Sequence, residues 1–268
     1  PTIAFIGGGN MASAIIGGLI HQGHPASQIE VVEPWAEARE ALRKNYGIEA
    51  QAEAGPALQR AQIVVWAVKP QTFRDAAAQA KAHTQGALHL SVAAGIRSDS
   101  IAQWLGTERI VRTMPNTPAL VGKGMSALYA RPAVSAPERQ SIEAIMATTG
   151  EFLWVDSEPQ LDAVTALSGS GPAYVFYFLE AMTRAGTDMG LTAAQAHQLA
   201  VGTFVGASEL ARRSDETPAV LRQRVTSKGG TTYAALQSME HDAVAEKFMQ
   251  AMQAARQRAH ELGDEFGK

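Results

Sequence analysis

The run Thr2-Ile3-Ala4-Phe5-Ile6-Gly7-Gly8-Gly9-Asn10-Met11-Ala12 decides the fold of this chain. Its apolar start predicts a buried strand, and the residues after the glycines predict a helix over 11–22. Between them Gly7, Gly9 and Ala12 form the pattern G-x-G-x-x-A. Gly7 permits a tight turn, Gly9 lets a pyrophosphate approach the backbone, and Ala12 lets the helix pack closely on the strand. The run therefore predicts a dinucleotide-binding strand–turn–helix unit.

The next predicted strand, over 29–32, ends in Glu33. An acidic side chain at this place in a strand–helix–strand unit accepts hydrogen bonds from the adenosine ribose hydroxyls. A purely structural glycine turn is the alternative, because the glycine pattern alone is a weak signal. The strand, turn, helix and acidic strand end in sequence favour a bound dinucleotide.

Strands and helices alternate along the first part of the chain, up to about residue 155. Apolar runs such as Ile63-Val64-Val65-Trp66-Ala67-Val68 indicate burial on both faces and hence a mainly parallel, doubly wound sheet. Strands are predicted over 3–6, 29–32, 63–68, 87–92, 109–113, 125–129 and 152–155. Helices are predicted over 11–22, 36–45, 72–83, 98–105 and 136–148.

Ligands of such sheets bind beyond the carboxyl ends of the strands. The segments that follow strands here are small, polar or proline-containing: Lys69-Pro70, Ala93-Ala94-Gly95 and Met114-Pro115-Asn116-Thr117-Pro118-Ala119. Ordinary loops have the same composition. Their shared position after consecutive strands makes them candidates for the second half of the dinucleotide site.

From about residue 158 the strand pattern stops, and helices are predicted over 161–184, 192–213, 218–224 and 231–261. We therefore expect two domains, a Rossmann-type domain over 1–156 and a helical domain over 157–268. The helical half is rich in Ala and Met, and we expect it to complete its core against a second copy of the chain.

The segment Val225-Thr226-Ser227-Lys228-Gly229-Gly230-Thr231-Thr232 lies between two of these helices and contains four hydroxyl side chains. A Gly-Gly step that opens a helix leaves main-chain N–H groups free, with the positive end of the helix dipole behind them. Such a helix start suits a small anion such as a carboxylate. A simple helix N-cap is the alternative, but a cap needs only one hydroxyl.

Bulk composition excludes several classes of function. The chain has 268 residues, a net charge of −3 and no basic run, which argues against nucleic acid and anionic membranes as partners. It has no cysteine, which excludes thiolate catalysis and Cys-based metal sites, and its seven histidines show no ligand spacing, so we expect no metal. The first strand begins at residue 2, and we expect a cytoplasmic protein without a targeting segment.

Six blocks along essentially the full length make the chain resemble the pyrroline-5-carboxylate reductases. They are F-I-G-G-G-N-M-A at 5–12, A-V-K-P at 67–70, S-V-A-A-G-I at 91–96, M-P-N-T-P-A at 114–119, L-S-G-S-G-P-A-Y at 167–174 and V-T-S-K-G-G-T-T at 225–232. The last block is the most specific. The resemblance implies reduction of Δ1-pyrroline-5-carboxylate to L-proline with NADPH or NADH, the last step of proline biosynthesis. It also implies a helical C-terminal domain that interlocks two subunits of a homodimer, with a higher homo-oligomer left open.

The resemblance also assigns site residues. The pyrophosphate would meet Gly7, Gly9, Asn10, Met11 and Ala12, and the nicotinamide half would meet Val68, Lys69, Pro70, Ala94, Gly95, Asn116 and Thr117. The substrate carboxylate would meet Ser227, Gly229, Gly230 and Thr231. Thr232 would face the ring nitrogen as the catalytic hydroxyl, and Glu158 would border the substrate.

Two positions depart from the family pattern. Lys228 stands where the family usually has proline, and Glu33 stands where members that prefer NADPH usually carry an uncharged or basic residue. Glu33 therefore favours NADH. The absence of an obvious catalytic His or Cys is expected, because a protonated cyclic imine is already electrophilic and needs chiefly orientation and dry surroundings.

Three other functions stay open from the sequence. A related imine reductase would share the two-domain plan. A β-hydroxyacid dehydrogenase would carry a lysine on the first helix of the second half, but residues 161–179 contain none. A non-catalytic dinucleotide-sensing protein is the third, and the intact hydroxyl and glycine segments argue against it.

Overall fold

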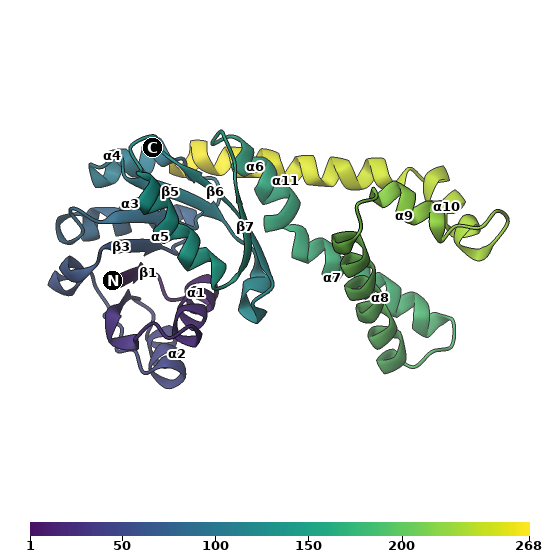
Figure 1. Cartoon of the computed structure of the whole chain (residues 1–268), viewed down its shortest axis with the longest axis horizontal. Helices are drawn as coiled ribbons and strands as arrows, with labels where there is room; N and C mark the ends of the chain where they lie inside the picture. Colours follow the sequence, from purple (N-terminus) through teal and green to yellow (C-terminus); the bar gives the residue numbers. More distant parts are fainter. The chain divides into compact units, whose positions relative to one another are not determined.

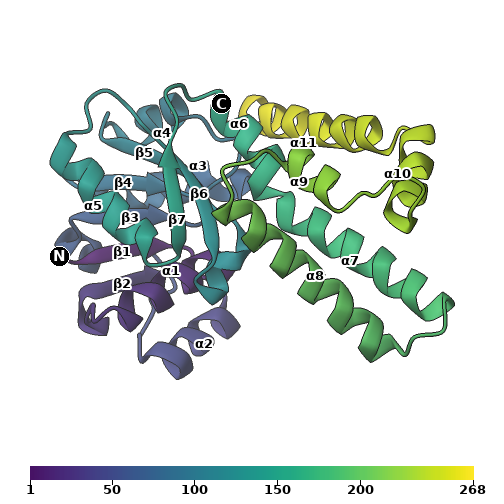
Figure 2. The same ribbon diagram turned by 45° about the vertical axis from the view of Figure 1, so that its right-hand side comes forward.

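In the computed structural model, which describes residues 1–268, seven strands form one sheet in the order β2-β1-β3-β4-β5-β6-β7 (Figure 1 and Figure 2). All neighbouring strands are parallel except β5 and β6. The strands are β1 Ile3–Ile6, β2 Ile29–Val32, β3 Ile63–Trp66, β4 Leu88–Ser91, β5 Ile110–Met114, β6 Gly124–Ala130 and β7 Gly150–Trp154. The predicted Rossmann-type sheet is confirmed, with one antiparallel pair added near its edge.

Helices cover both faces of the sheet because its central strands are apolar on both sides. In β1, Ile3 and Phe5 pack with α1, α2 and α5, whereas Ala4 and Ile6 pack with α3 and α4. Successive residues of a strand point to opposite faces, so an uninterrupted apolar run builds two cores. These helices are α1 Asn10–His21, α2 Ala36–Tyr46, α3 Pro70–Ala80, α4 Ser98–Leu105 and α5 Ala136–Ala147.

The strand order reverses next to β1. The chain passes from β1 to β2 on one side, and then returns to β3 on the other, with Phe5 in register with Val31 and Val65. The crevice beyond the carboxyl ends of β1 and β3 is thus the topological switch point, where open α/β sheets bind ligands. The strand predicted over 63–68 ends earlier, at Trp66, because the chain turns there into the residues that border this crevice.

The rest of the chain is helical, with α6 Gln160–Val164, α7 Gly171–Asp188, α8 Ala193–Arg213, α9 Pro218–Arg224, α10 Thr231–His241 and α11 Val244–Phe266. Figure 2 shows α7 and α8 as an antiparallel hairpin. In the chain, α10 directly precedes α11. None of these helices combines the length and hydropathy needed to cross a membrane.

Two of the predicted helices are wrong in extent. The helix predicted over 161–184 is interrupted by a π-helical stretch, Thr165–Gly169, in which Gly169 passes close to the Met114 side chain. The helix predicted over 231–261 is two helices, because Ala243 adopts a left-handed conformation with φ 53° between them.

By their internal packing, residues 1–172 and 254–268 form one compact unit, and residues 173–253 form a second. The expected boundary between residues 156 and 157 therefore lies inside the first unit. The chain enters the second unit along α7 and returns from it along α11.

His89 is a buried titratable group in the core of the sheet. It is 2 % exposed, and its Nδ1 accepts a hydrogen bond from the Trp66 indole N–H at 3.0 Å. Burial, and to a lesser extent the charge of Arg109, lowers the pKa of His89 to about 4. The folded protein therefore contains a neutral His89, whereas the unfolded chain protonates it near its ordinary pKa of about 6.5.

This pKa difference predicts a specific loss of stability in acid. As the pH falls from about 6.5 towards 4, His89 binds a proton in the unfolded state but not in the folded state. The free energy of unfolding therefore decreases. His89→Gln keeps an acceptor for Trp66 but cannot titrate. Between pH 7 and pH 4.5 we expect wild type to lose about 2.5 kcal/mol more than the variant, measured by denaturant unfolding at fixed protein concentration. Parallel pH profiles for the two proteins would show that His89 is not buried as a neutral group.

Candidate active site

The turn from β1 to α1 is built from backbone without side chains. Gly7 has φ +99°, and a Cβ there would lie 2.2 Å from the Ala67 carbonyl oxygen, so only glycine fits. At Gly9 a Cβ would meet nothing within 4 Å, and Gly9 precedes α1 without any side-chain cap. The first-turn amides of α1 are therefore not capped by a side chain and lie beside open space, which is the arrangement that holds a phosphate.

That open space is part of a cavity of about 530 Å³ at the switch point. Of the predicted site residues, Gly7, Gly9, Glu33, Val68 and Lys69 line it. Four other polar and aromatic lining residues were not predicted from the sequence: Trp35, Thr72, Asp75 and Gln79. Thr72, Asp75, Ala76 and Gln79 recur at the i, i+3, i+4, i+7 spacing of one helix face, so the pattern of α3 contained the signal.

Glu33 is held firmly at the end of β2. One carboxylate oxygen accepts from the Gly8 N–H at 2.6 Å, and the other accepts from the Trp35 N–H at 3.0 Å. The nearby Arg39 guanidinium donates to the carbonyl oxygens of Glu33 and Pro34, at 3.0 and 2.6 Å. Arg39 is thus engaged by the backbone, and the polar group fixed at this end of the cavity is an anionic acceptor.

The remaining predicted cofactor residues lie along the carboxyl edge of the sheet. Asn10, Met11 and Ala12 form the first turn of α1, and Pro70 begins α3. Ala94 and Gly95 lie between β4 and α4, and Asn116 and Thr117 follow β5. These four segments share one edge because β1, β3, β4 and β5 are parallel.

The Asn116 side chain makes two hydrogen bonds within the protein that the sequence did not indicate. Its amide nitrogen donates to the Ser168 carbonyl at 3.1 Å, and its amide oxygen accepts from the Met125 N–H at 2.9 Å. The side chain therefore joins the end of β5 to β6 and to the π-helical stretch. The neighbouring Thr117 is exposed, and the contact of this turn with a cofactor stays a prediction.

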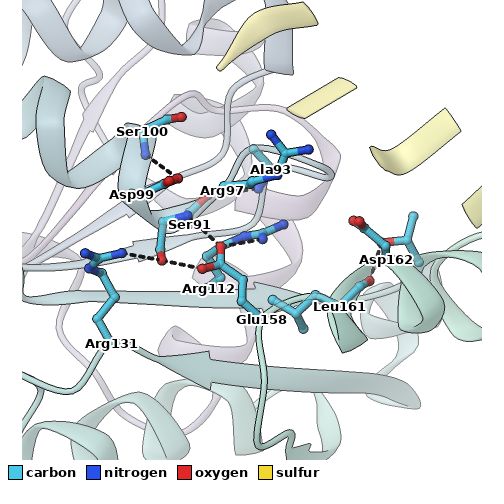
Figure 3. Close-up of polar contacts among 12 residues, drawn as sticks. Ser91, Ala93, Arg97, Asp99, Ser100, Arg112, Arg131, Glu158, Leu161 and Asp162 are labelled. Carbon is cyan, nitrogen blue, oxygen red and sulfur yellow. Dashed lines mark hydrogen bonds and ion pairs between the residues drawn. The ribbon is translucent and has the colours of Figure 1, made fainter. Parts of the chain in front are cut away.

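The Glu158 carboxylate also accepts hydrogen bonds from neighbouring residues of the protein. One of its oxygens accepts from the Ser98 hydroxyl at 2.6 Å, and the other from the Ser98 N–H at 2.6 Å and from Arg112 at 2.8 Å. Burial disfavours the charged carboxylate, but the Arg112 charge and the Ser98 hydrogen bonds outweigh it and lower the pKa of Glu158. Figure 3 shows the carboxylate directed at Arg112 and away from Asp162. Both oxygens are engaged within the protein, so Glu158 holds Ser98 and Arg112 in place, and its contact with the substrate stays a prediction.

The predicted carboxylate site lies in the second unit, between α9 and α10. Gly229 has φ +73°, and Gly230 stands at the N-cap of α10 with no side-chain cap. The Gly230 N–H is itself used, since it donates to the Ser227 carbonyl at 3.0 Å. The expected anchor on Gly229 and Gly230 stays a prediction, and of these two amides the Gly230 N–H already has an acceptor within the turn.

A comparison within the same unit shows that the N-cap alternative is wrong for this segment. Both α8 and α9 begin with a threonine, Thr192 or Thr217, whose hydroxyl accepts from a first-turn amide. The hydroxyls near α10 do not cap it, and Thr226 instead donates to the Arg222 carbonyl at 2.6 Å. The start of α10 keeps its donors for another acceptor.

Comparisons with known proteins agree with this geometry. A family model for pyrroline-5-carboxylate reductase dimerisation matches residues 158–262, and a model for NADP oxidoreductase, coenzyme F420-dependent, matches residues 2–95. The pyrroline-5-carboxylate reductase of Pseudomonas aeruginosa is 44 % identical over 270 aligned positions, which cover 100 % of this chain and 99 % of that protein.

The chain belongs to the pyrroline-5-carboxylate reductase family.

Solved structures support the same assignment. The pyrroline-5-carboxylate reductase of Coxiella burnetii superimposes with a TM-score of 0.88 at 37 % identity, covering 97 % of this chain and 98 % of that one. The Plasmodium falciparum enzyme, solved with NADP bound, has a TM-score of 0.89 at 27 % identity and covers 98 % of each chain. The chain is thus an NAD(P)H-dependent pyrroline-5-carboxylate reductase by family, and the dehydrogenase and sensor alternatives are not favoured.

The open position at Gly9 gives a direct test of the dinucleotide site. Gly9→Ala adds a methyl group that meets no protein atom, at an ordinary backbone conformation, so the fold is expected to keep its melting temperature. The same methyl group fills the space through which a pyrophosphate approaches, and we expect the NADH dissociation constant to rise by about tenfold or more.

Gly55→Ala is the matched control. A Cβ at Gly55 also meets nothing within 4 Å, and Gly55 lies outside the lining of the cavity. Fluorescence titration of NADH should show unchanged binding for this control. Equal NADH affinities for wild type and Gly9→Ala would show that the pyrophosphate does not pass Gly9.

Proposed function

We propose that the chain reduces the cyclic imine by direct hydride transfer, with the substrate carboxylate held at the start of α10 and the ring nitrogen facing Thr232. The bound reduced dinucleotide supplies the hydride. The new C–H bond forms at the imine carbon, the π electrons of the C=N bond move to nitrogen, and the product is the secondary amine. Because the protonated imine is already electrophilic, the protein has only to bind, orient and exclude water.

The uncapped N-terminus of α10 carries this proposal. Its first-turn amides and its dipole favour an anion, and a carboxylate is the only anionic group of the substrate. The Thr232 hydroxyl, one residue into the helix, can donate to or accept from a ring nitrogen without adding charge. Ser227 and Thr231 supply further hydroxyls beside the carboxylate. Lys228, exposed in the same turn, adds positive charge to the site.

For the cofactor we propose that the glycine turn holds the pyrophosphate and Glu33 the adenosine ribose. Gly7, Gly9 and Glu33 line one cavity, which supports this assignment. The nicotinamide half would then extend past Val68, Lys69 and Pro70 towards the segments after β4 and β5, with Ala94, Gly95, Asn116 and Thr117. These segments follow neighbouring parallel strands and so lie in sequence along one edge.

We further propose that the active enzyme is a homodimer formed by the helical region and that it works in the cytoplasm, where reduced dinucleotides are available. The match to a dimerisation model over 158–262 supports the first point. Large apolar side chains exposed on α7 and α8 support it too, and they include Phe176, Tyr177, Leu199, Val205 and Leu210. Such a surface is normally covered by another subunit.

Thr232→Val tests the catalytic assignment. Valine keeps the shape of the side chain but removes the hydroxyl that faces the ring nitrogen, so we expect kcat to fall by at least about tenfold while NADH affinity is unchanged. Thr226→Val is the control in the same segment, because the Thr226 hydroxyl is bonded to the Arg222 carbonyl. Steady-state kinetics with pyrroline-5-carboxylate measure both. Unchanged turnover in purified Thr232→Val would remove Thr232 from the mechanism.

Glu33→Ser tests cofactor choice. The fixed carboxylate accepts from the ribose hydroxyls of NADH and repels the 2′-phosphate of NADPH, so we propose a preference for NADH. Losing one charged hydrogen bond and that repulsion should raise the NADPH-to-NADH ratio of kcat/KM roughly 10- to 100-fold. Glu30→Ser is the control, because Glu30 lies on the same strand and pairs with Arg60 instead. A ratio that Glu33→Ser leaves unchanged would show that another group selects the cofactor.

A further inference from the structure

The segment between β4 and α4, residues 92–97, is held in its middle and at its α4 end by residues that flank the second unit in the chain. We infer that Glu158 and the last turns of α11 are positioning groups for hydride transfer, because together they hold this segment. The inference rests on the proposed placement of Ala94 and Gly95 beside the nicotinamide.

Glu158 holds the end of the segment where α4 begins. Its carboxylate accepts from both the N–H and the hydroxyl of Ser98, the first residue of α4. Ser98 is fully buried, and Arg112, which pairs with the same carboxylate, is only 4 % exposed. Arg131 adds a further donor to the Ser98 hydroxyl at 3.0 Å. A carboxylate bonded in this way in a buried site has one available position, and it fixes where α4 starts.

The last turns of α11 hold the middle of the segment through a contact between two glycines. A Cβ on Gly95 would lie 2.5 Å from the Ala259 carbonyl oxygen and 2.8 Å from the Leu262 side chain. A Cβ on Gly263 would lie 2.6 Å from the Gly95 carbonyl oxygen. Neither glycine can gain a side chain without moving the backbone of the segment or of the helix.

Polar contacts fasten the same pair of elements. Arg97 donates to the His260 carbonyl at 3.2 Å and to the Asp264 carboxylate at 2.9 Å. The Ser100 hydroxyl donates to the Gly267 carbonyl at 2.6 Å. Gly95, Arg97 and Ser100 thus all contact the end of α11 or the residue that follows it. A shift of α11 would therefore move the segment and the start of α4.

Glu158 and the last turns of α11 flank the second unit in the sequence. Glu158 stands ahead of the helices that lead into residues 173–253, and residues 259–267 come after them. A displacement of Glu158 or of residues 259–267 would therefore shift the segment that contains Gly95. The effect expected on chemistry is large, since a misplacement of about 1 Å between reacting groups costs up to about 100-fold in rate.

Two substitutions, each with a matched control, test the inference in the full-length enzyme. Glu158→Gln weakens the hold on Ser98, and Gly263→Ala pushes on the Gly95 carbonyl. Glu138→Gln is the control for the first, since Glu138 also pairs with an arginine, Arg109, and bonds to a helix-capping serine, but at the amino edge of the sheet. Gly186→Ala is the control for the second, because its Cβ would press on Ala196 at 2.8 Å, within the second unit.

The readouts are single-turnover hydride transfer with NADH and hydrogen exchange of the amides of residues 93–98. We expect both test variants to slow hydride transfer by about 10- to 100-fold and to speed exchange in this segment, with the NADH dissociation constant within about threefold of wild type. The controls should change neither readout. If Glu158→Gln does not fold, Ser98→Ala replaces it, because this change removes the hydroxyl contact and leaves the Glu158–Arg112 pair in place.

Two results would overturn the inference, and they differ in meaning. Unchanged exchange of residues 93–98 in both test variants would show that Glu158 and α11 do not hold the segment. Faster exchange with unchanged hydride transfer would show that the segment is held but that Ala94 and Gly95 do not face the nicotinamide, which contradicts the proposed cofactor placement and leaves the family activity intact.

Discussion

The close passage of Gly7 beside the Ala67 carbonyl is the constraint on which the dinucleotide site depends. A side chain at Gly7 would collide with the turn that follows β3, so the first helix could not begin where the strand order reverses. Gly230 has a similar effect at the start of α10, since it leaves that helix without a side-chain cap. Both proposed ligand sites therefore offer main-chain amides, which bind anions without the cost of burying a charged side chain.

Features that depend on local backbone chemistry could be predicted from the sequence. The turn at Gly7, the strand that precedes it and the helix over Pro218–Arg224 follow from glycine, apolar runs and proline at a helix start. The break between α10 and α11 could not be predicted, because Ala243 takes a left-handed conformation that alanine does not signal. The π-helical stretch could not be predicted either, and it brings Gly169 close to the side chain of Met114, which is distant in the chain.

In the candidate site, too, some residues could be predicted from local sequence and others depend on tertiary contacts. Gly7, Gly9 and Glu33 were predicted from their spacing and line one cavity. Glu158 and Asn116 were assigned by resemblance, which gives a position but not the partners of a side chain. Their partners, Ser98 with Arg112 and Ser168 with Met125, come together only when the sheet is assembled. Periodicity does not reveal a tertiary network of this kind.

A crystal structure of the enzyme with NADH and proline tests the central claim most directly. The account predicts that the proline carboxylate lies within hydrogen-bond distance of the Thr231 and Thr232 amides of one subunit. Its ring should then stack on a nicotinamide bound along the carboxyl edge of a sheet, in the same or the partner subunit. Proline bound elsewhere, with residues 226–232 remote from the nicotinamide in every pairing of subunits, would contradict the account.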